Sequence, residues 1–318
     1  MNFKKPCDIF LLPRRLVGQN FCFGGGNMPR KIEYIIPAEY DGRKVKHYLR
    51  GAAGVSSRLM NSLKTYPDGI TLNGEHIRTI DIIKEGDVLA VNIPDRFGET
   101  QPIKMPLDIV YEDDDFIVIN KSPFVAMHPT HNHQGDTLAN GLVYYLQKSN
   151  KPTVFRAVGR LDKGTSGLVV CALNPLSASK IPVTARKEYI AVVSGDAPES
   201  GTVDSPIYRP DPMKTLRCVD ERGDSAVTHF EKIAGNGEMS LLRLKLETGR
   251  THQIRVHMAS LGMPIVGDSL YGTDTRGIGH QLLHRSKIEL THPVTGERMT
   301  FEAPPPEDMK RFIDEMKT

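Results

Sequence analysis

One acidic side chain, Asp162, lies in the segment of the chain that is richest in potentially reactive groups, GRLDKGTSG at residues 159–167. Three glycines and two cations surround this carboxylate, and the apolar run Leu168–Leu173 follows at once, which predicts a tight loop at the start of a strand. A phosphate-binding P-loop would need lysine where Thr165 stands, and a serine hydrolase would need Gly-x-Ser-x-Gly. Phosphate and serine hydrolysis therefore lose their main support, although Asp162 in this loop alone is more typical of a turn-capping residue.

A second segment, TGRTHQIRVHM at residues 248–258, has the pattern of a loop that leads into a helix. Thr251 is a suitable N-cap and Gly262 a suitable end, so Arg255 is predicted in the first helical turn. A guanidinium there, beside the positive end of the helix, is well placed to hold a carboxylate ionised or to accept a phosphate. The alternative is an ordinary surface arginine.

Both segments belong to a long unit, residues 107–318, which a polar linker at 96–106 separates from the N-terminal part. Leucines recur at helical spacing over residues 138–146, and Asp136 is a suitable cap for that helix. Short apolar runs predict strands at Ile109–Tyr111, Phe116–Ile119, Leu168–Leu173, Tyr189–Val193, Val227–Phe230, Leu241–Leu246 and Ile288–Leu290. Because strands dominate and few helices interrupt them, we expect an α+β fold with a mixed, largely antiparallel sheet.

Residues 31–95 have the pattern of a small separate unit. Helical spacing predicts two short helices, the second capped by Ser56, and the pair Asn73-Gly74 predicts a β-hairpin before the closing strand Val88–Ile93. This order, with the runs ITLNG and GDVLAV, resembles the small RNA-binding module named after a ribosomal small-subunit protein, the S-four type. The resemblance implies RNA contacts from the basic side chains Arg43, Lys44, Lys46, Arg50 and Arg58. The alternative is that these helices present an ordinary solvated face.

The charge of the chain is unevenly distributed. Residues 1–60 hold 11 Lys and Arg against 4 Asp and Glu, a surplus of +7, and the remainder carries −4, which indicates an anionic partner gripped through the N-terminal region. Residues 1–30 show no sustained period, so we expect a flexible basic arm or an extension that the native protein lacks. The second alternative rests on Gly24–Gly26 ahead of Met28, because glycine codons begin with GG and resemble a ribosome-binding site before a start codon.

Composition argues against several other classes of protein. The four cysteines form no CxxC pair and no zinc spacing, which fits a reducing cytoplasm. The apolar runs are of strand length and far short of the roughly 20 residues that cross a bilayer. His128, His131 and His133 lie close in sequence without further ligands at a suitable spacing, so we expect no metal site.

Four successive motifs carry a second resemblance, which covers about residues 107–302. They are GRLDKGTSGLVVCALNP (159–175), KEYIAVVSG (187–195), TGRTHQIRVHMASLGMPIVGDSLYG (248–272) and LHRSKIELTHPVTGE (283–297). In this order they resemble the motifs of the RluA-type family of RNA pseudouridine synthases, and the S-four-type module in front makes the chain similar to the RluD-like branch, whose best known members modify large-subunit (23S) ribosomal RNA. The resemblance implies a cofactor-free isomerase that acts on structured RNA, and we expect a cytoplasmic monomer without membrane association.

The same resemblance implies roles for individual residues. Asp162 is the essential carboxylate, which attacks the ribose or the base or deprotonates the sugar, and Arg255 is its basic partner. Tyr189 packs on the target uracil, where stacking contributes about 1–3 kcal/mol per base. Ile254 lines the base pocket, and Arg160 moves toward the space that the extruded nucleotide leaves.

The chain also departs from the family pattern. The motif NKPxGLxxHP is here NKSPFVAMHP at residues 120–129, and the stretch between Asn174 and Lys187 is expected to be short, with Lys180–Ala185 in place of most of a helix. These changes are expected to affect how the protein contacts the RNA and therefore which RNA it modifies. The alternatives that stay open are a catalytically inactive RNA-binding protein and a synthase that acts on transfer RNA. A glycosidase is less well supported, because it would need a second carboxylate in a motif.

Overall fold

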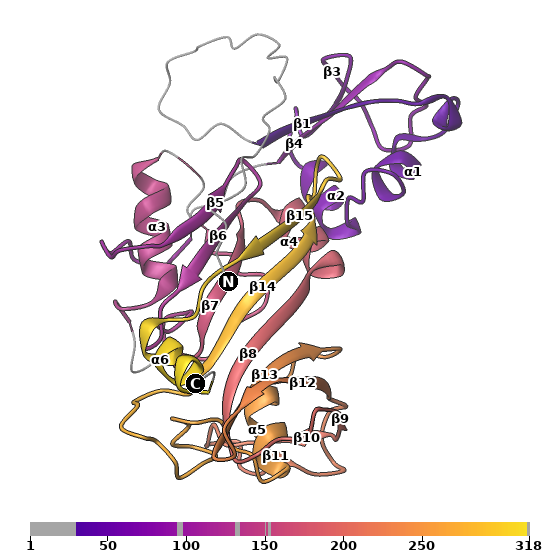
Figure 1. Ribbon diagram of the computed structural model, residues 1–318. Coiled ribbons are helices and arrows are strands. Elements are labelled where there is room, and N and C mark those ends of the chain that lie inside the picture. The colour runs from indigo at the N-terminus through magenta and orange to yellow at the C-terminus, as the bar shows by residue number, and fades with distance from the viewer. Residues whose placement is uncertain (1–29, 94–97, 131–133, 150, 152–153, 317–318) are drawn as a thin grey trace.

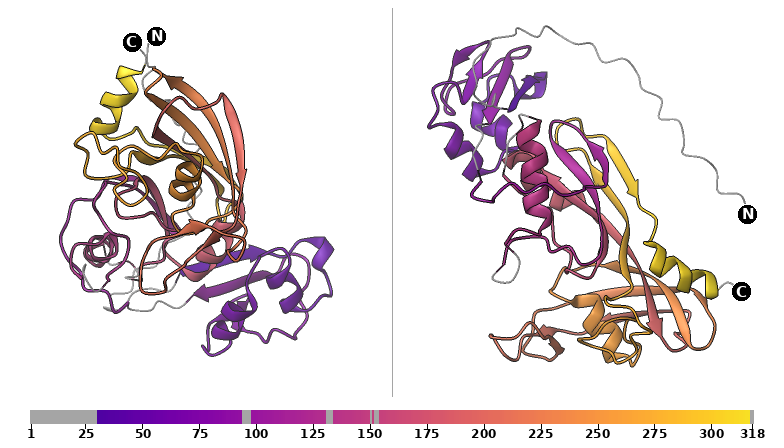
Figure 2. Two further views of the ribbon diagram at one scale, coloured as in Figure 1. Left: turned by 90° about the horizontal axis from the view of Figure 1, so that it is seen from below. Right: turned by 90° about the vertical axis from the view of Figure 1, so that its left-hand side faces the viewer.

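The computed structural model describes residues 30–93, 98–130, 134–149, 151 and 154–316 (Figure 1). The predicted arm at residues 1–30 lies, apart from Arg30, outside the described residues, as do His131 and His133. A four-stranded sheet near the N-terminus and a nine-stranded sheet account for most of the strands. The small sheet and its helices lie at one end of the large sheet (Figures 1 and 2).

The N-terminal unit comprises β1 (Arg30–Ile35), α1 (Val45–Arg50), α2 (Ser57–Leu63), β2 (Ile70–Leu72), β3 (Glu75–His76) and β4 (Val88–Ile93). Its strands pair antiparallel in the order β1-β4-β2-β3. Asn73 and Gly74 both have positive φ, so the predicted hairpin turn is confirmed, and Ser56 caps α2 as predicted. Strand β1, which the sequence analysis missed, pairs with β4 along its whole length.

The large sheet has the strand order β5-β6-β7-β14-β8-β13-β12-β9, with β15 paired to β14. Its strands are β5 (Ile109–Glu112), β6 (Phe116–Lys121), β7 (Ser166–Ala172), β8 (Arg186–Ser194), β9 (Ser200–Asp204), β12 (Val227–Gly235), β13 (Met239–Leu246), β14 (Leu283–Thr291) and β15 (Arg298–Glu302). The pair β7–β14 is parallel and the other pairs of this sheet are antiparallel. The predicted mixed, largely antiparallel α+β fold is confirmed.

Four helices accompany the large sheet: α3 (Leu138–Lys148), α4 (Pro175–Thr184), α5 (Gln253–Ser260) and α6 (Glu307–Glu315). All seven residues of β7 are buried, and alternate residues point to opposite faces of the sheet. Val169 packs in the core cluster that contains Leu142 of α3, whereas Val170 packs in the cluster that contains Ile181 of α4. Burying each such aliphatic side chain contributes about 1.5–3 kcal/mol, so the central strand is held firmly from both sides.

Three local expectations are wrong. Helix α3 is capped by Thr137, whose hydroxyl accepts from the N–H of Asn140, and not by Asp136. Helix α5 begins after His252 and not after Thr251. The stretch expected to lack most of a helix forms α4, which Asn174 caps.

The two sheets are joined by an ion pair between β1 and the turn that precedes β6. Arg30 Nη2 and Nε donate to the two carboxylate oxygens of Asp115 at 2.8 and 3.2 Å. Leu176 of α4 belongs to the apolar core of the N-terminal unit, so packing reinforces this contact. No helix in the described ranges is both long enough and apolar enough to span a bilayer.

A further hairpin lies between β9 and β12, beside α5 (Figure 1). Its strands β10 (Ile207–Tyr208) and β11 (Cys218–Val219) pair with each other in a two-stranded sheet of their own. Ile207 packs in a small cluster with Val256 of α5, and Tyr271 lies against it. The hairpin is therefore attached to the helix that carries Arg255.

Candidate active site

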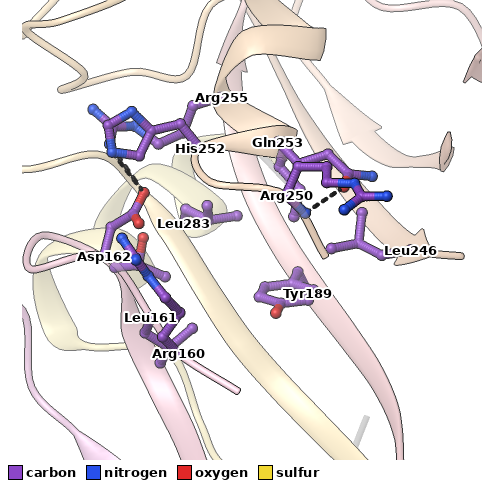
Figure 3. Close-up of a pocket in the computed structure, with 12 residues that line it drawn as sticks. Arg160, Leu161, Asp162, Tyr189, Leu246, Arg250, His252, Gln253, Arg255 and Leu283 are labelled. Carbon is purple, nitrogen blue, oxygen red and sulfur yellow. Dashed lines mark hydrogen bonds and ion pairs between the residues drawn. The ribbon is translucent and has the colours of Figure 1, made fainter. Parts of the chain in front are cut away.

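A pocket opens where the loop before β7 meets β8 and the first turn of α5 (Figure 3). Its lining includes all five residues that the sequence analysis assigned to the site: Arg160, Asp162, Tyr189, Ile254 and Arg255. These residues come from three segments that are far apart in the chain, and the fold brings them together. Leu161, Leu246 and Leu283 add apolar surface to the same pocket.

Asp162 is held through one of its carboxylate oxygens. Arg255 Nη1 donates to Oδ2 at 3.0 Å, and His252 Nε2 lies 3.7 Å from the same atom. Among the described residues no group donates a hydrogen bond to Oδ1, and 17% of the Asp162 side chain is exposed. The carboxylate is thus fixed in direction and keeps one oxygen available to a molecule in the pocket.

Arg255 is itself held from behind by Asp268, which the sequence analysis did not single out. The Nε and Nη2 of Arg255 donate to the two oxygens of Asp268 at 2.7 and 2.8 Å, which leaves Nη1 for Asp162. Burial acts to lower the pKa of Arg255, but the bonds to Asp268 and Asp162 outweigh it and the pKa is raised. The guanidinium stays charged between two carboxylates, of which Asp268 is buried and Asp162 faces the pocket.

His252 adopts a left-handed backbone conformation, with φ of 60°, at the start of α5. This conformation is uncommon outside glycine. The His252 Nδ1 lies 2.8 Å from the hydroxyl of Tyr271, which ties the strained residue to the loop after α5. Burial lowers the pKa of His252 below its ordinary value, so the ring is neutral at pH 7 and Arg255 supplies the positive charge beside Asp162.

Tyr189 projects from β8, and its hydroxyl is clamped by Arg285 of β14. Arg285 donates to the Tyr189 hydroxyl from Nε at 3.0 Å and from Nη2 at 2.7 Å. It also donates to the carbonyls of Leu168 at 3.1 Å and Arg160 at 3.2 Å. Arg285 is only 2% exposed and has no carboxylate partner in the described part of the chain. A buried guanidinium is costly unless its donors are satisfied, and here they tie the tyrosine to the loop of Asp162.

Lys121, the lysine retained in the altered NKSP motif, also bonds the loop that carries Asp162. Its Nζ donates to the carbonyls of Ser122 and Val125 at 2.9 Å and of Lys163 at 3.1 Å. Burial lowers the pKa of Lys121 to about 7. Gly167, the second residue of β7, has φ of 108°, and a Cβ there would lie 2.3 Å from the carbonyl oxygen of Arg285. Glycine is therefore required where β14 passes the loop.

The basic residues predicted to contact RNA lie on α1, on α2 and just before α1. Arg43, Lys44, Arg50 and Arg58 are exposed, and Lys46 is half-buried. Within the described ranges none of them forms an ion pair with a carboxylate, and the Arg43 guanidinium lies over the Tyr40 ring, 5.6 Å from its centroid. Their contact with RNA stays a prediction.

One cluster of possible metal ligands occurs among the described residues: Asp113, Asp115 and His292. Its members are already paired, because His292 Nε2 bonds Asp113 at 2.9 Å and Arg30 bonds Asp115 at 2.8 Å. The cluster lies at the junction of the two sheets, away from the pocket. These hydrogen bonds give the three side chains a structural role that requires no metal ion.

The chain is similar to known proteins over most of its length. Residues 115–260 match the family model described as RNA pseudouridylate synthase. The Bacillus subtilis protein named uncharacterized RNA pseudouridine synthase YjbO is 41% identical over 85% of this chain and 98% of its own. Ribosomal large subunit pseudouridine synthase D of Haemophilus influenzae is 34% identical over 92% of each chain, and that of Xanthomonas campestris is 39% identical over 89% of this chain and 92% of its own.

Solved structures share the fold. Human RNA Pseudouridylate Synthase Domain Containing 1 matches with a TM-score of 0.52 and 24% identity over 70% of this chain and 98% of its own. Human RNA Pseudouridylate Synthase Domain Containing 4 matches with a TM-score of 0.53 and 21% identity over 66% of this chain and 92% of its own. The identity to bacterial relatives over nearly the whole chain shows that this protein belongs to the RluA/RluD-type family of RNA pseudouridine synthases, which are isomerases.

Proposed function

We propose that this protein converts specific uridines of large-subunit ribosomal RNA to pseudouridine and that Asp162 is its catalytic carboxylate. The observation that carries the proposal is the carboxylate of Asp162, which Arg255 holds by one oxygen while the other has no donor among the described residues. The names of the relatives in Haemophilus influenzae and Xanthomonas campestris support large-subunit ribosomal RNA as the substrate.

The reaction is an internal rearrangement of one nucleotide. The bond from ribose carbon one to uracil nitrogen one breaks, the base turns, and a bond from the same ribose carbon to uracil carbon five forms. Carbon five loses a proton and nitrogen one gains one, so atoms balance and no oxidant is consumed. Asp162 acts as a nucleophile toward the ribose or the base, or as a base toward the sugar, and each route requires an ionised and well-aimed carboxylate.

The other pocket residues would bind and orient the base. Tyr189 offers a ring on which uracil stacks, and its position is fixed because Arg285 holds the hydroxyl. Ile254 is buried and adds an apolar wall. Arg160 is exposed at the rim, where it can enter the space that the flipped nucleotide leaves.

The N-terminal unit would hold the RNA at a distance from the chemistry. Its basic residues are exposed and lack carboxylate partners in the described ranges, which supports phosphate contacts. We expect the enzyme to act as a monomer in the cytoplasm. The free thiols of Cys171 and Cys218 fit a reducing compartment.

The test uses unmodified, in vitro-transcribed 23S ribosomal RNA of Bacillus subtilis labelled with tritium at uracil carbon five. Wild-type protein should release tritium, and Asp162→Asn should release none while binding the transcript with unchanged affinity. Chemical mapping of pseudouridine in the product then locates the target uridine. Tritium release by Asp162→Asn at the wild-type rate would remove Asp162 from the mechanism, and release from transfer RNA but not from 23S RNA would correct the substrate.

A further inference from the structure

A second hollow lies directly beside the active-site pocket and is lined by arginines of the β10–β11 hairpin. Arg209 and Arg217 line it from the hairpin, Arg222 lines it from the turn after β11, and Arg250 lines it from the loop before α5. Arg250 also lines the pocket of Asp162, so the two hollows adjoin. Four arginines thus surround a space next to the proposed base pocket.

Two of these arginines are already paired with carboxylates. Arg222 donates to both oxygens of Asp220 at 2.9 and 2.7 Å, and Arg250 Nη1 lies 3.8 Å from Asp224. These pairs cancel much of the local charge. The attraction of the hollow for an anion must therefore come from the other two arginines.

Arg209 and Arg217 have no carboxylate partner in the described part of the chain. Arg209 Nε donates to the carbonyl of Lys214 at 2.9 Å, and Arg217 Nη1 donates to the carbonyls of Thr215 and Leu216 at 2.7 and 2.9 Å. These main-chain bonds fix the direction of each guanidinium but leave its charge uncompensated. Both side chains keep further N–H groups for a ligand.

Positive charges are concentrated around Arg217. Partial burial and the neighbouring charges of Arg209 and Arg160 lower the pKa of Arg217, and Asp162 and Tyr271 oppose this shift. Mutual repulsion between guanidinium groups is unfavourable in the free protein, and an anion bound among them relieves it. Arg160 belongs to the pocket lining, so the charges extend from the hairpin to the site of chemistry.

The hairpin is also held in position relative to Asp162. The backbone N–H of Arg217 donates to the hydroxyl of Tyr271 at 2.9 Å. Tyr271 in turn lies 2.8 Å from His252 Nδ1, and the Arg255 guanidinium lies over its ring at 5.0 Å from the centroid. A single tyrosine therefore joins the arginine hollow to the group that holds the catalytic carboxylate.

We propose that Arg209 and Arg217 form a phosphodiester-binding site that grips the RNA backbone next to the target uridine. The proposal rests on the proposed function, because a nucleotide whose base enters the Asp162 pocket brings its flanking phosphates to the adjoining hollow. The planar guanidinium suits this ligand, since it donates two parallel N–H bonds to phosphate oxygens. Phosphate contacts here would offset part of the unstacking energy that base extrusion requires.

The test compares Arg209→Gln, Arg217→Gln and the double variant with Arg311→Gln, which removes an equal charge from an exposed position on α6. Binding to unmodified Bacillus subtilis 23S transcript is measured between about 50 and 200 mM salt. Each hairpin variant should weaken binding about ten-fold and reduce the slope of log K against log salt by roughly one. Arg311→Gln should leave the slope unchanged, and Arg217→Lys should restore most of it.

Two outcomes would overturn the proposal. One is a salt slope for Arg217→Gln equal to that of Arg311→Gln. The other comes from thermal melts with and without inorganic phosphate. If the hairpin variants bind RNA with wild-type affinity but are no longer stabilised by inorganic phosphate, the site takes a free anion and not the RNA backbone. Either result leaves tritium release by the wild-type protein intact, whereas failure of the proposed function appears as no release by the wild-type protein.

Discussion

Strand β7 has an aspartate near each end, and each aspartate meets an arginine. Asp162 bonds Arg255 at 3.0 Å before the first residue of the strand, and Asp115 bonds Arg30 at 2.8 Å beside its last. The Asp115 side chain is 3% exposed, and Arg30 bonds both of its oxygens while Asn174 also donates to Oδ1. Asp162 is 17% exposed and uses one oxygen. The two ends, about 20 Å apart along seven residues, thus hold one carboxylate whose oxygens are both bonded and one whose second oxygen is open to the pocket.

The largest expected effect tests this contrast with matched substitutions. Asp162→Asn should lower kcat more than about a thousand-fold at unchanged thermal stability, because it removes the charge that we propose to react. Asp115→Asn should lower the melting temperature and leave kcat within about two-fold, because it weakens the junction with Arg30. Tritium release and thermal melts measure the two quantities. A large loss of kcat in a folded Asp115→Asn protein would erase the distinction.

Asp268 should matter next, through Arg255. Asp268→Asn leaves the volume unchanged but withdraws the charge that orients the guanidinium, so kcat should fall roughly a hundred-fold, equivalent to about 2.7 kcal/mol. KM should change little, because Asp268 lies behind Arg255 and outside the pocket lining. Single-turnover rates at saturating RNA measure this. An effect confined to KM would contradict a positioning role.

Acid should weaken the end of β7 that lies nearest Asp162, through His284. Its Nδ1 accepts from Ser166 Oγ at 2.9 Å and its Nε2 donates to the carbonyl of Ala303 at 3.1 Å, and burial lowers its pKa from 6.5 to about 4. Between pH 4 and 6.5 the unfolded chain binds more protons than the folded protein. The contribution of neutral His284 to the free energy of unfolding is therefore fully present above pH 6.5. It falls by up to about 3 kcal/mol as the pH drops toward 4.

Urea unfolding at several pH values should show this loss in the wild type, and His284→Gln should flatten it. The free energies of the two proteins should therefore converge as the pH falls. A constant difference from pH 7 to 4.5 would assign the acid sensitivity to other groups.

A smaller effect should reveal the coupling of Tyr189 to Arg285. Tyr189→Phe removes the hydroxyl that Arg285 bonds twice and should lower kcat/KM about ten-fold. Arg285→Lys should cause a similar loss, and the double variant should lose little more, because both changes break one contact. Additive losses would show that the two residues act independently.

The smallest expected effect concerns the junction itself. Arg30→Gln should raise KM for the 23S transcript about three-fold and leave kcat unchanged, because the N-terminal unit then docks less firmly on Asp115. Steady-state kinetics measure both constants. A fall in kcat would show that the junction reaches the carboxylate at the other end of β7.

Features set by neighbouring residues were predictable from the sequence. Asn73-Gly74 forms its turn because both residues tolerate positive φ, and Ser56 caps α2 through an N–H three residues away. The first turn of α5 likewise contains Arg255 as predicted. The resemblance to the RluA-type family supplied the pocket residues as a group.

Hydrogen-bond partners that are far apart in the chain could not be predicted from the spacing of residues in the sequence. Arg285 bonds Tyr189 across 96 residues, and a buried arginine at that position has the same sequence signature as an exposed strand residue. The true start of α5 was missed for a related reason. Thr251 is the better cap by residue type, but the contact with Tyr271 stabilises His252 in the left-handed conformation.

The separate pairing of β10 with β11 has a consequence for which sequence changes the sheet tolerates. The hairpin connects β9 to β12, and these two strands pair over Ser200–Asp204 and Val227–Glu231 without it. Insertions or replacements within the hairpin therefore leave the nine-stranded sheet in register. Changes in this short stretch can alter the arginine-lined hollow while the sheet that carries Tyr189 keeps its register.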